Sequence, residues 1–229
     1  MDNDVEVAHT SELGRKEYWD ALYASEVDNF NSHSDTGEIW FGKAWEKRIV
    51  SWIKNQQQIH KDCHVIDLGC GNGSLLRSLS ALGYQNLLGI DYSAQAVELA
   101  RNLSATSTSS MQLAYEIMDI LQPAENFQQT FAEKFDVITD KGTFDAISLA
   151  ENAANCMQLY KNNVHLLGKT DAYFILVSCN FTSQELVEKF CTEERAKFVH
   201  IDSIDAGNEF SFGGASGRTV TGVVFRVCK

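Results

Sequence analysis

Seven residues from Asp67 to Gly73, DLGCGNG, form a glycine-rich turn between a short apolar segment and a helical pattern. Glycine suits such a turn because a side chain would keep the backbone away from a nucleoside ligand. The run fits the dinucleotide signature GxGxxG only in part, since Ser74 stands where the last glycine or alanine belongs. We therefore predict a nucleoside site whose loop residues are Gly69, Cys70, Gly71, Asn72 and Gly73.

Four aspartates follow four successive strand-like segments: Asp67, Asp91, Asp119 and Asp140. Asp67 is placed to pair with a cationic amino-acid head group, whereas it would repel a pyrophosphate. Asp91, followed by Tyr92, is placed to accept hydrogen bonds from both hydroxyls of a ribose. The alternative for Asp91 is to cap the helix that follows it.

The other two aspartates extend this pattern along the predicted sheet edge. Asp119, or the backbone amide of Ile120, is placed to hydrogen-bond the edge of an adenine, although loop aspartates are common. Asp140 adds a polar group at the carboxyl edge, where open α/β folds bind ligands. Together the acids suit a ligand with positive charge, which S-adenosylmethionine has at its sulfonium and amino groups. We predict this cofactor and no metal site, because the cysteines and histidines lack zinc-binding spacing.

The elements that position these residues alternate along the chain. Apolar stripes around residues 18–23 and 45–53 predict two helices before the core. Strands are then predicted at 63–68, 87–90, 113–119, 135–140, 172–178, 197–202 and 219–227, and helices at 75–83, 94–103, 144–167 and 182–191. This alternation indicates an α/β protein with a mostly parallel sheet and helices on both faces. The glycines before the last strand predict a tight reversal, which makes that strand antiparallel.

We expect three parts: a disordered acidic tail at 1–12, a helical segment and lid at 13–60, and a cofactor-binding domain at 61–229. The net charge of −12 disfavours nucleic acid as a partner. The chain shows neither a signal peptide nor an apolar run that could span a membrane. The six scattered cysteines are expected to be reduced thiols. We expect a cytoplasmic monomer, without excluding the nucleus.

The motifs also resemble a known family. DLGCGNG, GID and MD, across residues 63–140, resemble the motif series of class I S-adenosylmethionine-dependent methyltransferases, which use a Rossmann-like seven-stranded sheet. The flanking segments GRKEYWDALYASEVDNF, GEIWFG, DKGTFDAISL, SCNFT and FSFGG resemble the family that methylates a lysine of translation elongation factor 1-alpha. The resemblance covers most of the chain outside the tail, and it implies a protein-lysine N-methyltransferase with that substrate.

On the substrate side the resemblance leaves the catalytic residue open. Methyltransferases of exocyclic base amines carry (D/N)PP(Y/F) after the fourth strand, whereas this sequence has DKGT there, which argues against nucleic acid as the substrate. The aromatic residues are candidates for walls around the target lysine, although ordinary packing explains them equally well. Asn180 is a candidate to orient the amine, or a turn residue. The substrate-side candidates are Trp40, Asp140, Thr143, Asn180 and Phe212.

Three other interpretations remain open at this stage. A methyltransferase of another protein or of a small molecule would share all the cofactor motifs. A nicotinamide-dependent oxidoreductase would share the glycine loop and Asp91, but Asp67 and Ser74 disfavour it. A non-catalytic partner protein could retain the fold, but it would have no need for the intact loop and the four acids.

Overall fold

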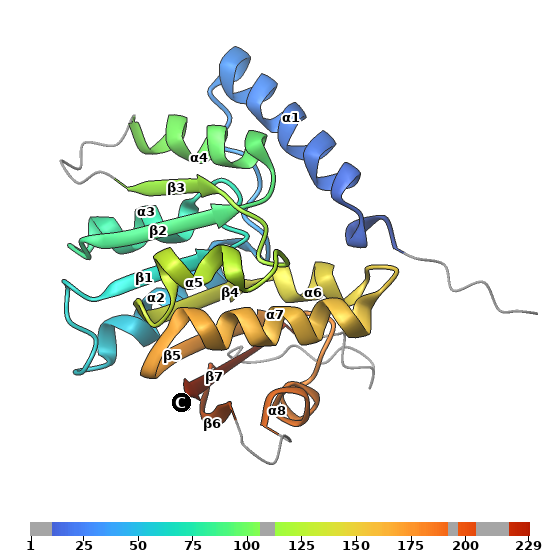
Figure 1. Cartoon of the computed structure of the whole chain (residues 1–229). Helices are drawn as coiled ribbons and strands as arrows, with labels where there is room; N and C mark the ends of the chain where they lie inside the picture. Colours follow the sequence, from blue (N-terminus) through green and yellow to red (C-terminus); the bar gives the residue numbers. More distant parts are fainter. Residues whose placement is uncertain (1–10, 106–112, 192–196, 205–219) are drawn as a thin grey trace, which may run out of the picture.

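The computed structural model describes residues 11–105, 113–191, 197–204 and 220–229, and its centre is a seven-stranded sheet (Figure 1). The strands are β1 (His64–Leu68), β2 (Asn86–Asp91), β3 (Ala114–Ile117), β4 (Phe135–Lys141), β5 (Gly168–Ser178), β6 (Phe198–Ile204) and β7 (Thr221–Val227). Their order is β3-β2-β1-β4-β5-β7-β6. Every pairing from β3 to β5 is parallel, and β7 runs antiparallel to both of its neighbours. The predicted sheet with an antiparallel C-terminal strand is therefore confirmed.

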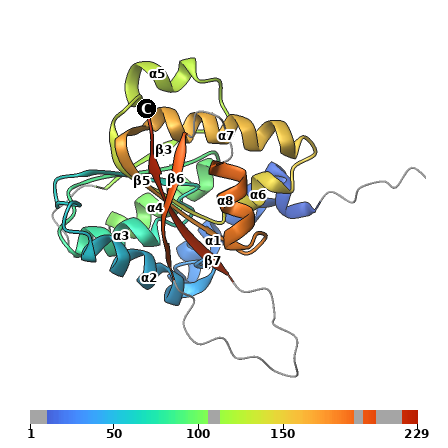
Figure 2. The same cartoon turned by 90° about the horizontal axis from the view of Figure 1, so that it is seen from below.

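Helices cover both faces of this sheet, as Figures 1 and 2 show. They are α1 (Lys16–His33), α2 (Gly42–Asn55), α3 (Ser74–Ala81), α4 (Ala94–Ala105), α5 (Glu125–Phe131), α6 (Thr143–Ser148), α7 (Ala153–Leu167) and α8 (Ser183–Cys191). Alternate strand residues point to opposite faces, so Ile66 and Ile138 pack with α5, α6, α7 and α8, whereas Val65 and Val137 pack with α2, α3 and α4. Burial on both faces explains the nearly unbroken apolar runs of the central strands.

Three local features differ from the sequence prediction. The helix expected at 144–167 is divided into α6 and α7, because the backbone N–H groups of Leu149 and Ala150 bond three residues back, to Ala146 and Ile147. Helix α5 was not predicted. The expected tail extends too far, since Ser11 caps a short 3-10 helix at Glu12–Gly14 and residues 1–10 lie outside the described residues.

The two N-terminal helices have different positions. Helix α2 belongs to the core, because its apolar stripe is buried in one cluster with residues of β1 and α3, although the sequence grouped it with the helical segment and lid at 13–60. Helix α1 lies over the edge of the molecule, and Val27 packs with Leu99 and Leu103 of α4. Within the described ranges, no helix is long and apolar enough to cross a bilayer.

Candidate active site

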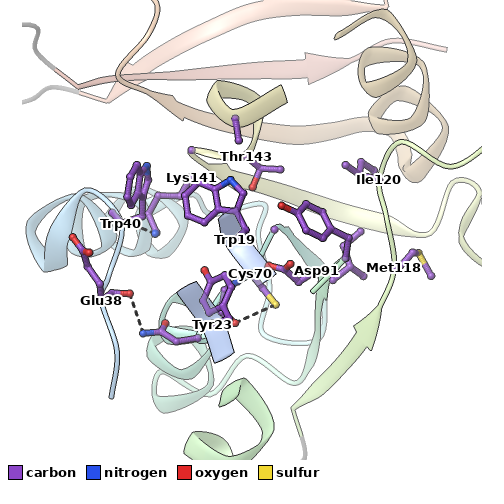
Figure 3. A pocket seen from close by; sticks show the side chains of 17 residues that line it. Trp19, Tyr23, Glu38, Trp40, Cys70, Asp91, Met118, Ile120, Lys141 and Thr143 are labelled. Carbon is purple, nitrogen blue, oxygen red and sulfur yellow. Dashed lines mark hydrogen bonds between the residues drawn. The ribbon is translucent and has the colours of Figure 1, made fainter. Parts of the chain in front are cut away.

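A cavity lies at the carboxyl ends of β1, β2 and β4, and it contains about 740 Å³ of empty space, part of it open to solvent (Figure 3). Open α/β sheets bind ligands at this edge. Helix α1, the segment before α2 and the glycine loop close it. The described residues that line it are Trp19, Tyr23, Glu38, Trp40, Gly69, Cys70, Gly71, Asn72, Ile90, Asp91, Tyr92, Met118, Ile120, Lys141, Gly142, Thr143 and Ala146.

The glycine loop between β1 and α3 has a backbone that only glycine adopts readily. Gly69 and Gly71 have φ angles of +63° and +52°, in the left-handed region that L side chains disfavour. A Cβ atom at Gly69 would lie 2.0 Å from the hydroxyl oxygen of Thr143, and one at Gly71 would lie 2.4 Å from that of Tyr23. The loop therefore needs glycine both for its turn and for the close approach of two neighbouring elements.

Asn72 joins the glycine loop to the segment that precedes α2. Its side-chain amide donates hydrogen bonds to the carbonyl oxygens of Thr36 (3.0 Å) and Glu38 (3.2 Å), and its Oδ1 accepts one from the backbone N–H of Ser74. The predicted lid segment is thus held against the loop that begins α3. Trp40, which follows this segment, is held over the cavity by packing against Trp19, with ring centroids 5.3 Å apart.

Asp91 is buried and its carboxylate is fixed in direction. One oxygen accepts a hydrogen bond from the backbone N–H of Gly71 at 3.1 Å, and the other from that of Ser93 at 3.0 Å. Burial raises its pKa to about 6. Asp91 thus lies beside the glycine loop, as predicted, and its remaining oxygen lone pairs are available to ligand hydroxyls. It does not cap α4, because Ser93 Oγ accepts the N–H of Ala96 there.

Asp67 lies beneath the loop and does not line the cavity. Its Oδ1 accepts a hydrogen bond of 2.7 Å from the hydroxyl of Thr139, and burial raises its pKa to about 6. Gly73 is likewise absent from the lining. The influence of Asp67 on a ligand is therefore that of a nearby negative charge.

Asp140 lies behind the cavity and not in it. Its carboxylate accepts hydrogen bonds from the backbone N–H groups of Thr143 (2.8 Å) and Phe144 (3.0 Å) and from the Tyr160 hydroxyl. It therefore caps the first turn of α6, and burial raises its pKa to about 8. The prediction that all four aspartates face the ligand does not match this arrangement, since buried helix N–H groups use Asp140.

Two further predicted residues do not line the cavity. Asp119 accepts the backbone N–H of Leu121 in a turn, while Ile120 next to it does line the cavity. Asn180 donates from its side-chain amide to the Asp145 carbonyl and the Ser148 hydroxyl, so it fixes the end of α6. Phe212 lies outside the described residues. Trp40 and Thr143, the other substrate-side candidates, do line the cavity.

Sequence reasoning missed several lining residues. Trp19 and Tyr23 were interpreted only as part of a helix stripe, and Glu38 and Lys141 only as parts of longer motifs. The indole N–H of Trp19 donates a hydrogen bond of 2.8 Å to the Leu13 carbonyl oxygen, and the ring of Trp19 forms a wall of the cavity. The available signal was a pair of aromatic residues, Trp19 and Tyr23, four positions apart and therefore on the same face of the helix.

Comparison with known proteins identifies the family. Residues 59–214 match a protein-family model that is described as a methyltransferase domain. EEF1A lysine methyltransferase 2 of Homo sapiens is 36% identical, over 94% of this chain and 87% of its own. Protein-lysine N-methyltransferase EFM4 of Saccharomyces cerevisiae is 34% identical, over 94% of this chain and 95% of its own. The chain belongs to this family of protein-lysine methyltransferases.

Membership in this lysine methyltransferase family confirms the resemblance drawn from the motifs, and it overturns the oxidoreductase and the non-catalytic interpretations.

Solved structures agree on the fold. A TehB-like SAM-dependent methyltransferase from Corynebacterium glutamicum has a TM-score of 0.58 at 16% identity, covering 91% of this chain and 97% of its own. Magnesium protoporphyrin IX methyltransferase from Synechocystis, solved with bound SAM, has a TM-score of 0.58 at 16% identity, covering 90% and 96%.

Proposed function

We propose that this protein transfers a methyl group from S-adenosylmethionine to a lysine side chain of translation elongation factor 1-alpha. The observation that carries the proposal is a cavity with two different sides. The glycine loop and Asp91 form one side, and the aromatic rings of Trp19 and Tyr23 of α1 and of Trp40, which precedes α2, form the other. The family relatives, which are named for lysine methylation of EEF1A, support the choice of substrate.

The loop side fits the cofactor. Gly69 and Gly71 bring bare backbone to the cavity wall, and the buried Asp91 carboxylate lies where a ribose would present two hydroxyls. Met118 and Ile120, which follow β3, add an apolar wall that suits an adenine. A single nucleoside is expected because the cavity volume is within the range of small-molecule sites.

The aromatic side fits a lysine stem. The Trp19 and Trp40 rings meet edge to face, with an interplanar angle of 75°, and Tyr23 stacks beside Trp19 at 6.5 Å. Such rings exclude water from an inserted alkyl chain, and removal from water lowers the pKa of an ammonium. Bound S-adenosylmethionine would supply a sulfonium methyl group, which passes to the lone pair of the neutral amine while sulfur keeps the bonding electrons. The protein contributes alignment and desolvation to this transfer.

A methyl-transfer assay tests the proposal. Purified elongation factor 1-alpha is incubated with the protein and S-adenosylmethionine labelled in the methyl group, and mass spectrometry locates the label. We expect label on lysine, and a loss of at least about tenfold in the variant Asp91→Asn. Asp119→Asn is the matched control. Asp119 lies in the turn after the neighbouring strand β3, but it does not line the cavity. Absence of label from every lysine would overturn the substrate assignment.

We also propose that the protein is a monomer located in the cytoplasm, with the nucleus as a second location. The six cysteines are all free thiols in the structure, which supports a reducing compartment. Fractionation of cells with an antibody to the protein tests the location, and light scattering of the purified chain tests the monomer. The acidic net charge of −12 supports a basic protein surface as partner and disfavours nucleic acid.

A further inference from the structure

Lys141 is the only lysine or arginine among the described residues that line the cavity. It is the last residue of β4, and its neighbours in the lining include the acids Glu38 and Asp91. Burial of an ammonium costs free energy unless a partner compensates for the lost hydration, so the position of Lys141 in this cavity requires an explanation. A structural ion pair would be the ordinary explanation.

The contacts of Lys141 do not amount to such an ion pair. Its Nζ atom donates a hydrogen bond of 3.0 Å to the backbone carbonyl oxygen of Trp40. An ammonium has three donors, and no carboxylate of the described residues forms a salt bridge with Lys141. Burial lowers its pKa, while the more distant charges of Asp67 and Glu46 act in the opposite direction. The side chain is thus a half-buried cation that still has hydrogen-bonding capacity toward the cavity.

The position of Lys141 matches one end of the cofactor. The strand order β3-β2-β1-β4 places Lys141 three strand spacings, about 14 Å, from the residues that follow β3. Figure 3 shows it beside Trp40, on the side of the cavity away from Met118 and Ile120. A nucleoside held by Asp91 and Ile120 would therefore extend its amino-acid tail across β1 toward β4. That tail ends in a carboxylate and an ammonium.

We propose that Lys141 binds the carboxylate of the cofactor's methionine portion, with the Trp40 carbonyl holding its Nζ atom in place. This inference rests on the proposed function and specifies its cofactor site. The buried negative charge of Asp67, under the same part of the loop, complements the cofactor's ammonium. Because Lys141 is tied to the backbone of Trp40, the same lysine would connect cofactor binding to the aromatic side of the cavity.

A second role for the same cation makes a different prediction. Lys141 could instead face the amine of the target lysine, where like-charge repulsion would favour the neutral form. The two roles differ in what they require of the cofactor: only the proposed role needs a carboxylate on the ligand. A ligand that lacks this one group separates them.

The experiment is calorimetric binding of two ligands, S-adenosylhomocysteine and its decarboxylated analogue, S-adenosyl-3-thiopropylamine. The native protein is expected to bind the analogue about 10- to 100-fold more weakly, because a charged hydrogen bond is lost. Lys141→Met should weaken S-adenosylhomocysteine by a similar factor and change the affinity for the analogue less than about threefold. Lys141→Arg, which keeps the charge, should retain a preference for the carboxylate.

The affinities of Lys141→Met for the two ligands distinguish carboxylate binding from other roles of Lys141. Unchanged affinity of Lys141→Met for the analogue also shows that the variant is folded with an intact nucleoside site. Equal weakening of both ligands would mean that Lys141 supports the cavity only through Trp40, and no change in either would mean that it acts elsewhere; both results overturn the proposal. Native protein that binds S-adenosylhomocysteine but labels no lysine of elongation factor 1-alpha would refute the proposed substrate and leave this inference intact.

Discussion

Substitution of Gly71 by alanine should destabilise the protein through two separable effects. The first is the backbone: Gly71 has a φ of +52°, and an L residue in the left-handed region costs about 1–2 kcal/mol. The second is steric, because the new Cβ atom would lie 2.4 Å from the hydroxyl oxygen of Tyr23. Overpacking of this kind costs about 1–3 kcal/mol. The expected loss in the free energy of unfolding is therefore about 2–5 kcal/mol.

A second substitution separates the two effects. Tyr23→Phe removes the hydroxyl oxygen, and the next atom of that ring, Cζ, is 3.4 Å from the Cβ position, which is an ordinary contact. The double variant Gly71→Ala with Tyr23→Phe should therefore recover the steric part, about 1–3 kcal/mol, and keep the backbone part. Gly83→Ala is the control for the backbone part, since Gly83 has a φ of +90° and no atom within 4 Å of the Cβ position.

Urea unfolding followed by circular dichroism gives the four free energies of this cycle and that of the control. Gly71→Ala should cost less free energy of unfolding when Tyr23 is already phenylalanine than when it is tyrosine. The cost of Gly71→Ala that remains in the Tyr23→Phe background should be similar to the cost of Gly83→Ala, because both then reflect the backbone alone. Additive effects of the two substitutions would show that the hydroxyl of Tyr23 does not press on the loop in solution. In that case the placement of α1 over the glycine loop would be wrong.

Three further predictions concern the acids and the aromatic wall. Asp91→Asn should weaken S-adenosylhomocysteine binding about 10- to 100-fold by calorimetry. Asp140→Ala, which removes the carboxylate that caps α6, should lower the free energy of unfolding by about 1–3 kcal/mol, and it should affect the affinity only indirectly, through the positions of Lys141 and Thr143. The pKa values of Asp67 and Asp91 rise from 3.8 to about 6 on burial, so the folded protein binds extra protons and its free energy of unfolding should fall as pH rises from about 4 to about 6. Each group contributes at most about 3 kcal/mol to that fall, and urea unfolding of Asp91→Asn over this range should show a shallower slope than the native protein. Trp40→Leu should raise KM for the protein substrate about 5- to 30-fold with little change in S-adenosylhomocysteine affinity, and an equal loss in both would argue against a substrate wall.

Most of the fold was predictable because its signals are local. Runs such as CHVIDL and AYFILVS are buried on both faces, and a parallel sheet leaves few other places for them. The break between α6 and α7 was not predictable in the same way. Leu149 lies against the 3-10 helix near Gly14, a contact between segments that are distant in the sequence. Such contacts leave no periodic signal in either segment.

The glycine loop and Asp91 were found from the sequence because their spacing follows from the strand–turn–helix unit itself. The direction of the other acids was not determined by that unit. Asp119 follows β3 and Asp140 lies at the end of β4, next to its last residue, yet each accepts backbone N–H groups of the turn or helix that follows. The sequence predicts that such a carboxylate lies at the carboxyl edge of the sheet. Whether it faces the ligand depends on whether buried backbone N–H groups nearby require it as a hydrogen-bond acceptor.

The segment that begins with Asp140 shows why a short motif can hold a site together without every residue touching the ligand. Asp140 caps α6, and this fixes Thr143, whose hydroxyl donates to the Leu68 carbonyl beside the glycine loop. Between them Lys141 reaches the cavity, and a Cβ atom at Gly142 would lie 2.5 Å from Trp40 Cδ1. Loss of the Asp140 cap would therefore shift Lys141 and Thr143 together. The aspartate supports the site through the positions of its neighbours, because its two carboxyl oxygens already accept hydrogen bonds from the backbone of α6 and from Tyr160.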